Sequence, residues 1–145
     1  MEIYYRTALI TDIPELIRLT NQLGYHIEKD QLIKNLNIIL TNNENIVFVA
    51  VKSDQLVGWI HAQSRYLIES PPYIEISGLI VDIEYRGLSI GKTLIHYCEK
   101  WSSEKEFHEI RVRTNSVRTD AIKFYSRIGF INTKTQHVFK KELFD

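Results

Sequence analysis

The residues best suited to chemistry lie between Val81 and Lys92. This segment reads Val-Asp-Ile-Glu-Tyr-Arg-Gly-Leu-Ser-Ile-Gly-Lys and joins a predicted strand to a predicted helix. Unpaired backbone N–H groups and the helix dipole attract an anion to the start of a helix. Gly87 and Gly91 let the backbone approach a ligand, and Arg86 and Lys92 add positive charge. The segment therefore predicts a pyrophosphate-binding loop, although an ordinary glycine turn into a helix would use the same residue types.

Residues 87–93 also approach the nucleoside-triphosphate pattern G-x-x-x-x-G-K-[ST]. The segment is one residue too short, and Arg86 stands where the first glycine should be. That pattern also requires a mostly parallel sheet, whereas the strands before this segment are predicted as antiparallel hairpins. A triphosphatase is therefore the less favoured interpretation, and ATP binding with Mg²⁺ would identify it.

Hydrophobic spacing predicts the elements that position this loop. Apolar residues recur at helical spacing in four segments, about residues 12–24, 30–40, 90–101 and 118–128. Strand-forming residues predict strands at about residues 3–7, 46–51, 55–62, 73–81 and 109–114, with one or two closing strands in 130–139. Gly78 falls inside one strand, which indicates a bulge or the close approach of another backbone or a ligand. This order predicts antiparallel strands followed by a βαβ-like unit.

Two motifs resemble those of the GNAT superfamily of N-acetyltransferases. Arg86-x-x-Ser89-x-Gly91 is similar to its acetyl-CoA signature R-x-x-G-x-G/A, with serine in place of the first glycine. Residues 121–130, Ala-Ile-Lys-Phe-Tyr-Ser-Arg-Ile-Gly-Phe, resemble its helix end A-x-x-F/L-Y-x-x-x-G-F. The resemblance implies an α/β (α+β) GNAT fold as one domain over residues 1–145. It implies about four helices and a mixed sheet of about six to seven strands, two of which splay apart to form the acetyl-CoA cleft.

The resemblance also implies which residues bind acetyl-CoA, the acetyl donor. The pantetheine arm would lie between strands 73–81 and 109–114, with Gly78 as the residue of close approach. The implied binding residues are Leu79, Ile80, Val81, Arg86, Gly87, Leu88, Ser89, Ile90, Gly91, Lys92, Asn115 and Arg118. The superfamily often has an asparagine where this chain has Arg118, so whether Arg118 or Asn115 takes that role stays open.

The implied reaction is direct attack of a primary amine on the thioester through a tetrahedral intermediate. A backbone N–H near Gly78 would stabilise the oxyanion. Tyr125 would donate a proton to the departing thiolate, although its type and position alone would favour packing beside Phe124 and Phe130. Glu75 is the favoured general base, used directly or through water, and His61 is the second choice.

The expected acceptor is a small-molecule amine, such as an aminoglycoside or a polyamine-like compound. The residues proposed to bind it are Tyr25, Glu28, Trp59 and His61. Capping and surface roles would equally explain Tyr25 and Glu28. A protein amine as acceptor, or a non-catalytic CoA-binding sensor or interaction module, remain alternatives. Homodimers are common in the superfamily.

Composition narrows the class of protein further. The chain has 145 residues, 44% of them hydrophobic, with 18 basic and 18 acidic residues. The length suits one domain, and the zero net charge gives no overall attraction to nucleic acid or an anionic membrane. The apolar stretches fall far short of the roughly 20 residues that span a bilayer, and the first residues do not resemble a secretory signal. We therefore expect a cytoplasmic protein without a nucleic-acid or membrane partner.

The metal-binding residue types are too few and too scattered to predict a metal site. Cys98 is the single cysteine, so neither an intrachain disulfide nor a thiolate pair for zinc is expected. The five histidines lack the H-E-x-x-H or H-x-H spacing of metal ligands. Cys98 lies on the apolar face of a predicted helix and is expected to be a core residue.

Overall fold

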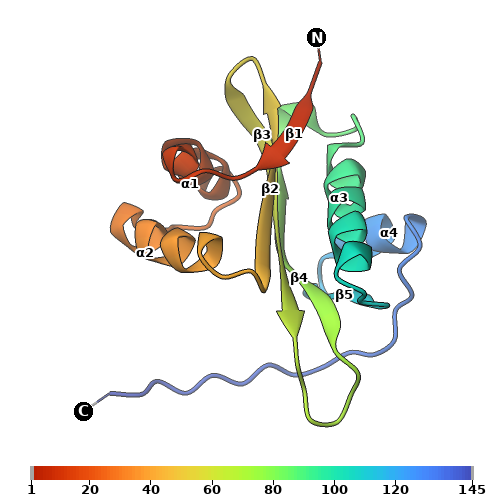
Figure 1. Cartoon of the computed structure of the whole chain (residues 1–145). Helices are drawn as coiled ribbons and strands as arrows, with labels where there is room; N and C mark the ends of the chain where they lie inside the picture. Colours follow the sequence, from red (N-terminus) through yellow and green to blue (C-terminus); the bar gives the residue numbers. More distant parts are fainter. Residues whose placement is uncertain (1, 145) are drawn as a thin grey trace. The chain divides into compact units, whose positions relative to one another are not determined.

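The computed structural model describes residues 2–144, which form two compact units that divide between Arg113 and Thr114. The first unit contains a five-stranded sheet in the order β1-β2-β3-β4-β5 (Figure 1). The strands are β1 (Tyr4–Thr7), β2 (Asn45–Lys52), β3 (Gln55–Arg65), β4 (Tyr73–Val81) and β5 (Ile110–Val112). Neighbours from β1 to β4 are antiparallel, and β5 pairs with β4 in parallel.

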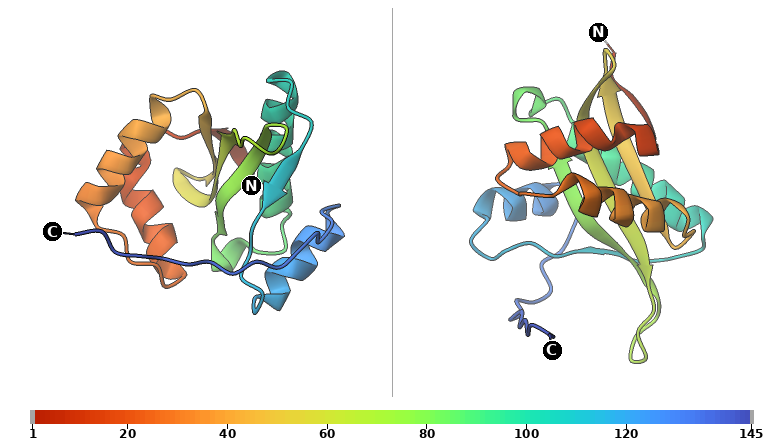
Figure 2. Two further views of the ribbon diagram at one scale, coloured as in Figure 1. Left: turned by 90° about the horizontal axis from the view of Figure 1, so that it is seen from below. Right: turned by 90° about the vertical axis from the view of Figure 1, so that its left-hand side faces the viewer.

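Helices cover both faces of this sheet. Helices α1 (Ile13–Gln22) and α2 (Lys29–Leu40) lie on one face, and α3 (Ile90–Glu104) lies on the other (Figures 1 and 2). Pro14 occupies the first turn of α1, and Gly24 follows its end with a positive φ of 89°, as the sequence predicts. The 3-10 turn η1 (Ile10–Asp12) precedes α1, and the 3-10 turn η2 (Ile83–Tyr85) lies in the segment between β4 and α3. No helix within residues 2–144 is long and apolar enough to cross a membrane.

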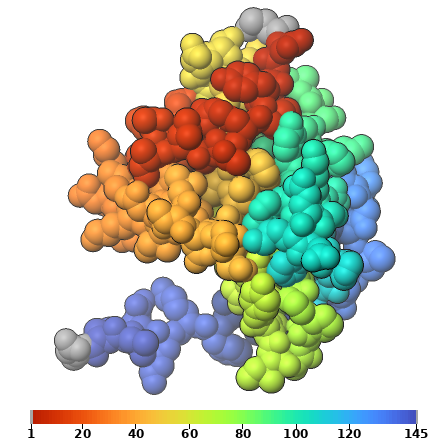
Figure 3. All heavy atoms as spheres, in the orientation of Figure 1, coloured from red at the N-terminus to blue at the C-terminus, as the bar shows by residue number. Residues whose placement is uncertain are grey.

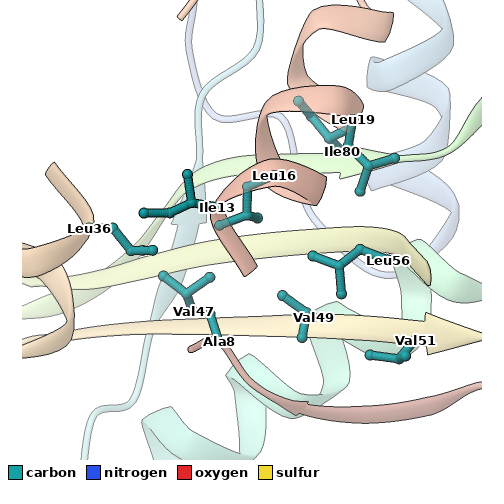
Figure 4. Close-up of a cluster of buried hydrophobic side chains, with 10 residues drawn as sticks. All are labelled: Ala8, Ile13, Leu16, Leu19, Leu36, Val47, Val49, Val51, Leu56 and Ile80. Carbon is teal, nitrogen blue, oxygen red and sulfur yellow. The ribbon is translucent and has the colours of Figure 1, made fainter. Parts of the chain in front are cut away.

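A hydrophobic core holds α1 and α2 against β2, β3 and β4 (Figure 4). Its buried members are Ala8, Ile13, Leu16, Leu19, Leu36, Val47, Val49, Val51, Leu56 and Ile80. Burying one such aliphatic side chain contributes about 1.5–3 kcal/mol. On the opposite face, Leu94, Ile95 and Cys98 of α3 are buried, as their helical spacing predicts. These contacts fix the sheet between its two helical layers.

Two β-bulges modify the register of the sheet. The pairing of β2 with β3 shifts between Ala50 and Val51, and the pairing of β3 with β4 shifts between His61 and Ala62. The second shift occurs opposite Ser77, since His61 pairs with Gly78 and Ala62 pairs with Ile76. A bulge leaves the extra residue out of the ladder and re-orients the strand. The bulge predicted from Gly78 is therefore confirmed, one residue before the glycine.

The sheet has five strands rather than the predicted six to seven. The segment expected to supply the closing strands, residues 130–139, has no regular secondary structure. Its β-branched and aromatic residues favour an extended chain, but a strand also needs a neighbour to accept its hydrogen bonds. Val138 and Phe139 are 91% and 92% exposed. Likewise β5 covers three residues rather than 109–114, because its pairing with β4 stops at Val112.

The second unit contains α4 (Thr119–Arg127) and the C-terminal segment. Gly129, with φ 104°, follows the end of α4, and the N–H of Phe130 donates to the carbonyl of Tyr125 at 3.0 Å. A left-handed glycine followed by a backward hydrogen bond is a common way to end a helix. The predicted stop at Gly129 is therefore confirmed.

In the first unit, the turn between β3 and β4 extends past the helices (Figure 3).

Candidate functional site

The segment from Asp82 to Ser89 joins β4 to α3 and contains the residues predicted to bind pyrophosphate. Gly87 has a φ of 82°, and a Cβ at this position would have no atom within 4 Å. Glycine is therefore needed for the backbone conformation rather than for space. Ser89 is the N-cap residue of α3 and adopts left-handed angles, φ 61° and ψ 22°. Such angles cost a non-glycine residue about 1–2 kcal/mol, so the surrounding loop must hold Ser89 in place.

The first turn of α3 has the properties of an anion site. It contains no acidic residue, and the Ser89 side chain does not cap the helix. Thr93 Oγ1 instead donates to the carbonyl oxygen of Ser89 at 2.7 Å. Arg86 and Lys92 are exposed beside this turn, and Leu88 is also exposed. The backbone N–H groups of the first turn, the helix dipole and two cations therefore converge on one short segment.

The outer edge of β4 is only partly covered. Parallel pairing joins residues 74–76 of β4 to residues 110–112 of β5. Within the described chain, residues 77–81 have β3 on one side and no strand on the other. Leu79, Ile80 and Val81 lie along this open edge, which leads directly into the loop. An extended ligand could hydrogen-bond to such an edge as an added strand would.

The ring of Trp59 lies where a side chain at position 78 would be. A Cβ on Gly78 would lie 2.8 Å from Trp59 Cη2 and 2.9 Å from Cζ3. The missing side chain of Gly78 therefore makes room for the Trp59 ring, and the close approach of a pantetheine arm at Gly78 stays a prediction. Trp59 Nε1 is buried without a hydrogen-bond partner, and the ring also packs against the core below α1 and α2.

Glu75 and His61 lie on the same face of the sheet as Trp59. Strand alternation puts His61 and Gln63 on that face, and their cross-strand partners Gly78 and Glu75 face the same way. The Glu75 side chain is 13% exposed, and its Oε1 lies 3.7 Å from Arg113 Nε. His61 Nε2 hydrogen-bonds Asn45 Oδ1 at 2.8 Å, and burial lowers the pKa of its imidazole. The structure thus brings Glu75, His61 and Trp59 together beside the bulge.

The two other predicted acceptor residues lie in the connection between α1 and α2. Tyr25 is exposed there, and Glu28 occupies the N-cap position of α2 without making a side-chain capping bond. Both residues are in the exposed connection rather than on the sheet face that carries Trp59. The part of Tyr25 and Glu28 in acceptor binding therefore stays a prediction.

Tyr125, Arg118 and Asn115 belong to the second unit. The Tyr125 ring packs edge-on against Phe124 and Phe130, with centroid distances of 5.1 and 5.5 Å. Burial raises the pKa of the Tyr125 phenol, and the Arg118 charge opposes that rise. Asn115 Oδ1 accepts the N–H of Val117 at 3.1 Å, and Arg118 is the N-cap residue of α4. The aromatic packing considered for Tyr125 from sequence alone is present.

Sequence reasoning missed a group of residues at the exit of β4. Asp82 is only 2% exposed, and its carboxylate interacts with Arg18 and Gln22 of α1. An acidic residue directly after an apolar strand is visible in the sequence, but its partners lie some 60 positions earlier. Only the fold brings them together.

The structure also describes the metal-binding residue types and the single cysteine. No group of three or more His, Cys, Asp or Glu residues that could hold a metal ion occurs in residues 2–144. Cys98 is buried, and burial raises the pKa of its thiol to about 12. A thiol this far from ionisation at neutral pH is a core residue rather than a nucleophile.

Solved structures similar to this chain include several acetyltransferases. One is aminoglycoside N-acetyltransferase AAC(6')-Iy in complex with CoA, which is 21% identical, with a TM-score of 0.88 over 98% of this chain and 96% of that one. Another is AAC(6')-Ih from Acinetobacter baumannii, an aminoglycoside antibiotic 6'-N-acetyltransferase, at 18% identity and a TM-score of 0.86 over 98% and 99% of the two chains. An aminoglycoside acetyltransferase from an uncultured soil metagenomic sample, in complex with trehalose, is 26% identical, with a TM-score of 0.81 over 97% and 96%.

Sequence comparison gives the same family. A search of curated proteins finds no significant match. The family model for acetyltransferases of the GNAT type matches residues 10–130, which include both motifs and the whole sheet except β1. This match extends over most of the chain, and the similar structures share its fold. The protein is therefore an N-acetyltransferase that belongs to the GNAT family, whose acetyl donor is acetyl-CoA.

Proposed function

We propose that this enzyme transfers the acetyl group of acetyl-CoA to a primary amine of an aminoglycoside-like small molecule. One observation carries the proposal: the open edge of β4 leads directly into a basic loop at the start of α3. The edge suits an extended pantetheine arm, and the loop suits a pyrophosphate. Structures similar to this chain are described as aminoglycoside N-acetyltransferases, and this supports the class of acceptor.

The bulge at Ser77 offers a place for the reacting carbonyl. An N–H released from the ladder there would donate to the thioester oxygen and stabilise the oxyanion that forms on attack. The neutral amine attacks the carbonyl carbon, so a C–N bond forms and the C–S bond then breaks. The amine loses one proton, and the thiolate of CoA gains one. Preorganised donors of this kind usually supply the largest single contribution to catalysis of acyl transfer.

Glu75 is the proposed general base, and Trp59 and His61 are the residues proposed to line the binding site of the acceptor amine. Glu75 lies close to the bulge at Ser77 on the sheet face that carries Trp59 and His61, and its Oε1 lies 3.7 Å from Arg113 Nε. His61 is held by Asn45 and stays neutral because burial lowers the pKa of its imidazole. An ammonium group has a pKa near 10.4, so a base, used directly or through water, is needed at neutral pH.

Tyr125 is the proposed proton donor to the CoA thiolate. Burial raises the pKa of its phenol, so the hydroxyl stays protonated across the neutral range. Replacing Tyr125 by phenylalanine should leave the Kd for acetyl-CoA unchanged and lower kcat by about a hundredfold or more. Tyr66→Phe, at an exposed tyrosine after β3, is the matched control and should change neither. Equal turnover in Tyr125→Phe and the parent would remove Tyr125 from the mechanism.

The function is tested first by calorimetry and then by thiol release. The parent protein should bind acetyl-CoA and should not bind ATP with Mg²⁺. Release of CoA thiol should then be fastest with an aminoglycoside, slower with a polyamine and slowest with a lysine peptide. Binding without release for any amine would identify a CoA-binding module without catalysis, and preference for the peptide would contradict the proposed acceptor.

We also propose that the protein forms a homodimer. The supporting observation is the C-terminal segment, in which five large apolar side chains are exposed: Ile131, Val138, Phe139, Leu143 and Phe144. Large apolar side chains exposed within one segment of a chain are available to an interaction surface. Light scattering should give twice the monomer mass for the full chain and the monomer mass for a chain that ends at Phe130. A full-length monomer would contradict the dimer.

A further inference from the structure

Asp82 is a buried carboxylate at the point where the sheet gives way to the loop. Its exposure is 2%, and its Oδ1 accepts the N–H of Glu84 at 3.0 Å. Its own N–H donates to the carbonyl of Val57 at 2.9 Å. A buried carboxylate is costly unless several donors surround it. The positions of these donors therefore determine the direction in which the chain leaves β4.

Two side chains of α1 supply the remaining donors. Arg18 Nη1 lies 3.3 Å from Asp82 Oδ2, and Gln22 Nε2 lies 3.3 Å from Asp82 Oδ1. The same amide of Gln22 accepts the N–H of Ile83 through Oε1 at 3.0 Å. The Gln22 amide therefore hydrogen-bonds both the Asp82 carboxylate and the backbone N–H of Ile83. One side chain fixes the first two residues after β4.

Arg18 is itself held in one orientation. Glu15 accepts two of its hydrogen bonds, at 2.8 and 3.2 Å, and the carbonyl of Leu56 accepts another at 2.8 Å. Glu15 Oε1 also accepts the N–H of Leu56 at 3.0 Å. The planar guanidinium fork suits several acceptors at once. The helix is therefore tied to the start of β3 and the end of β4 by one continuous network.

The hydrophobic core does not need this polar network to hold α1 on the sheet. The apolar face of α1, with Ile13, Leu16 and Leu19, already holds the helix on the sheet. The polar contacts concentrate instead at the exit of β4, from which the chain runs through Gly87 to the left-handed Ser89. A strained conformation persists only where its surroundings over-determine it.

We propose that Arg18 and Gln22 are positioning residues for acetyl-CoA, which act through Asp82 and the Ile83 N–H to hold the pyrophosphate loop in its binding conformation. This inference rests on the proposed function, because it takes residues 83–92 as part of the donor site. Neither side chain is assigned a contact with acetyl-CoA. Loss of either side chain should weaken the binding of acetyl-CoA without abolishing acetyl transfer.

Gln22→Met is the sharpest test, because Gln22 is an exposed side chain whose loss leaves the core intact. Asn21→Met, at the neighbouring exposed position of α1, is the matched control. Calorimetry should show the Kd for acetyl-CoA raised about fivefold in Gln22→Met, equivalent to one ordinary hydrogen bond, and unchanged in Asn21→Met. At saturating acetyl-CoA, kcat should match the parent. Without ligand, the amides of Ile83 and Glu84 should exchange hydrogen faster in Gln22→Met.

Arg18→Lys is the second variant, because lysine keeps the charge but loses the fork. It should raise the same Kd and leave kcat at saturation near the parent value. If the parent fails to bind acetyl-CoA, the proposed function fails and this inference fails with it. If the parent binds but both variants keep its Kd and amide exchange, the positioning role alone is overturned. A fall in thermal stability with an unchanged Kd would also overturn it, because that result indicates a structural role.

Discussion

The indole ring of Trp59 occupies the space that a side chain at position 78 would need. Strand patterning predicted that this glycine marks a bulge or the close approach of another backbone or a ligand; a bulge lies beside it, and the group that comes close is a side chain, the Trp59 ring. The partner in that approach could not be predicted, because it depends on a cross-strand register that two bulges shift. A shift of one residue moves every side chain to the opposite face. Single residues such as Gly78 were therefore found from the sequence, but their contacts were not.

Gly78→Ala should destabilise the protein by about 1–3 kcal/mol, because its methyl group would overlap the Trp59 ring. Urea unfolding followed by circular dichroism measures the change. Phenylalanine lacks the two ring atoms in contact, so Trp59→Phe should absorb much of the cost when combined with Gly78→Ala. Additive effects of the two substitutions would contradict the predicted contact.

Cys98 should be unreactive toward Ellman's reagent in the folded protein. Its thiol is buried in the face of α3, and burial raises its pKa to about 12. Only the thiolate reacts, so both access and ionisation oppose labelling. One thiol should react after unfolding in guanidinium, which serves as the control. Rapid labelling without denaturant would show that α3 does not pack as described.

Helix α3 and the loop before it illustrate what sequence motifs predict about an element. The glycines and cations of residues 86–92 predicted both the loop and the start of the helix, and the structure agrees. Serine itself gives no signal for the left-handed backbone at Ser89, which stands where the acetyl-CoA signature has its first glycine. The C-terminal segment shows the opposite limit: residues 130–139 have the composition of a strand but no neighbouring strand. The composition of a segment indicates its local backbone preference, but not whether another strand lies beside it to pair with.

Ser89→Gly should stabilise the protein by up to about 1 kcal/mol. Glycine removes the left-handed strain of about 1–2 kcal/mol, and its greater freedom in the unfolded chain offsets part of this gain. Ser103→Gly, at an exposed position within the same helix, is the control and should destabilise by about 0.5 kcal/mol. Thermal unfolding of both variants measures the difference. Destabilisation by both would contradict the strained loop.

Two partly buried ion pairs lie within the N-terminal part of the chain, one between β1 and η1 and one within α1. Asp12 binds Arg6 through two contacts of 2.8 Å, and Glu15 binds Arg18. Hydrogen bonds from Arg18 lower the pKa of Glu15. Burial would raise the pKa of Asp12, but hydrogen bonds from Arg6 and the Leu9 N–H outweigh it. Because both carboxyls have lowered pKa values in the folded state, the unfolded state binds more protons in acid.

Thermal stability should therefore hold from neutral pH down to the ordinary pKa values of 4.5 for Glu15 and 3.8 for Asp12, and then fall as the pH drops through their lower folded values. Melting temperatures measured from pH 7 to pH 3 test this on the whole molecule. Glu15→Gln should be less stable than the parent at neutral pH, and its melting temperature should fall less steeply in acid. An identical acid profile for the two proteins would contradict the assignment.

The open edge of β4 has a consequence for handling the protein. Unpaired strand edges are templates on which other chains can add, and natural proteins usually cover or interrupt them. Here residues 77–81 have no strand on their outer side within the described part of the chain. If acetyl-CoA lies along this edge, it also shields the unpaired backbone groups from other chains for as long as it is bound. Preparations stripped of CoA should then precipitate on storage, and adding CoA back should keep them clear.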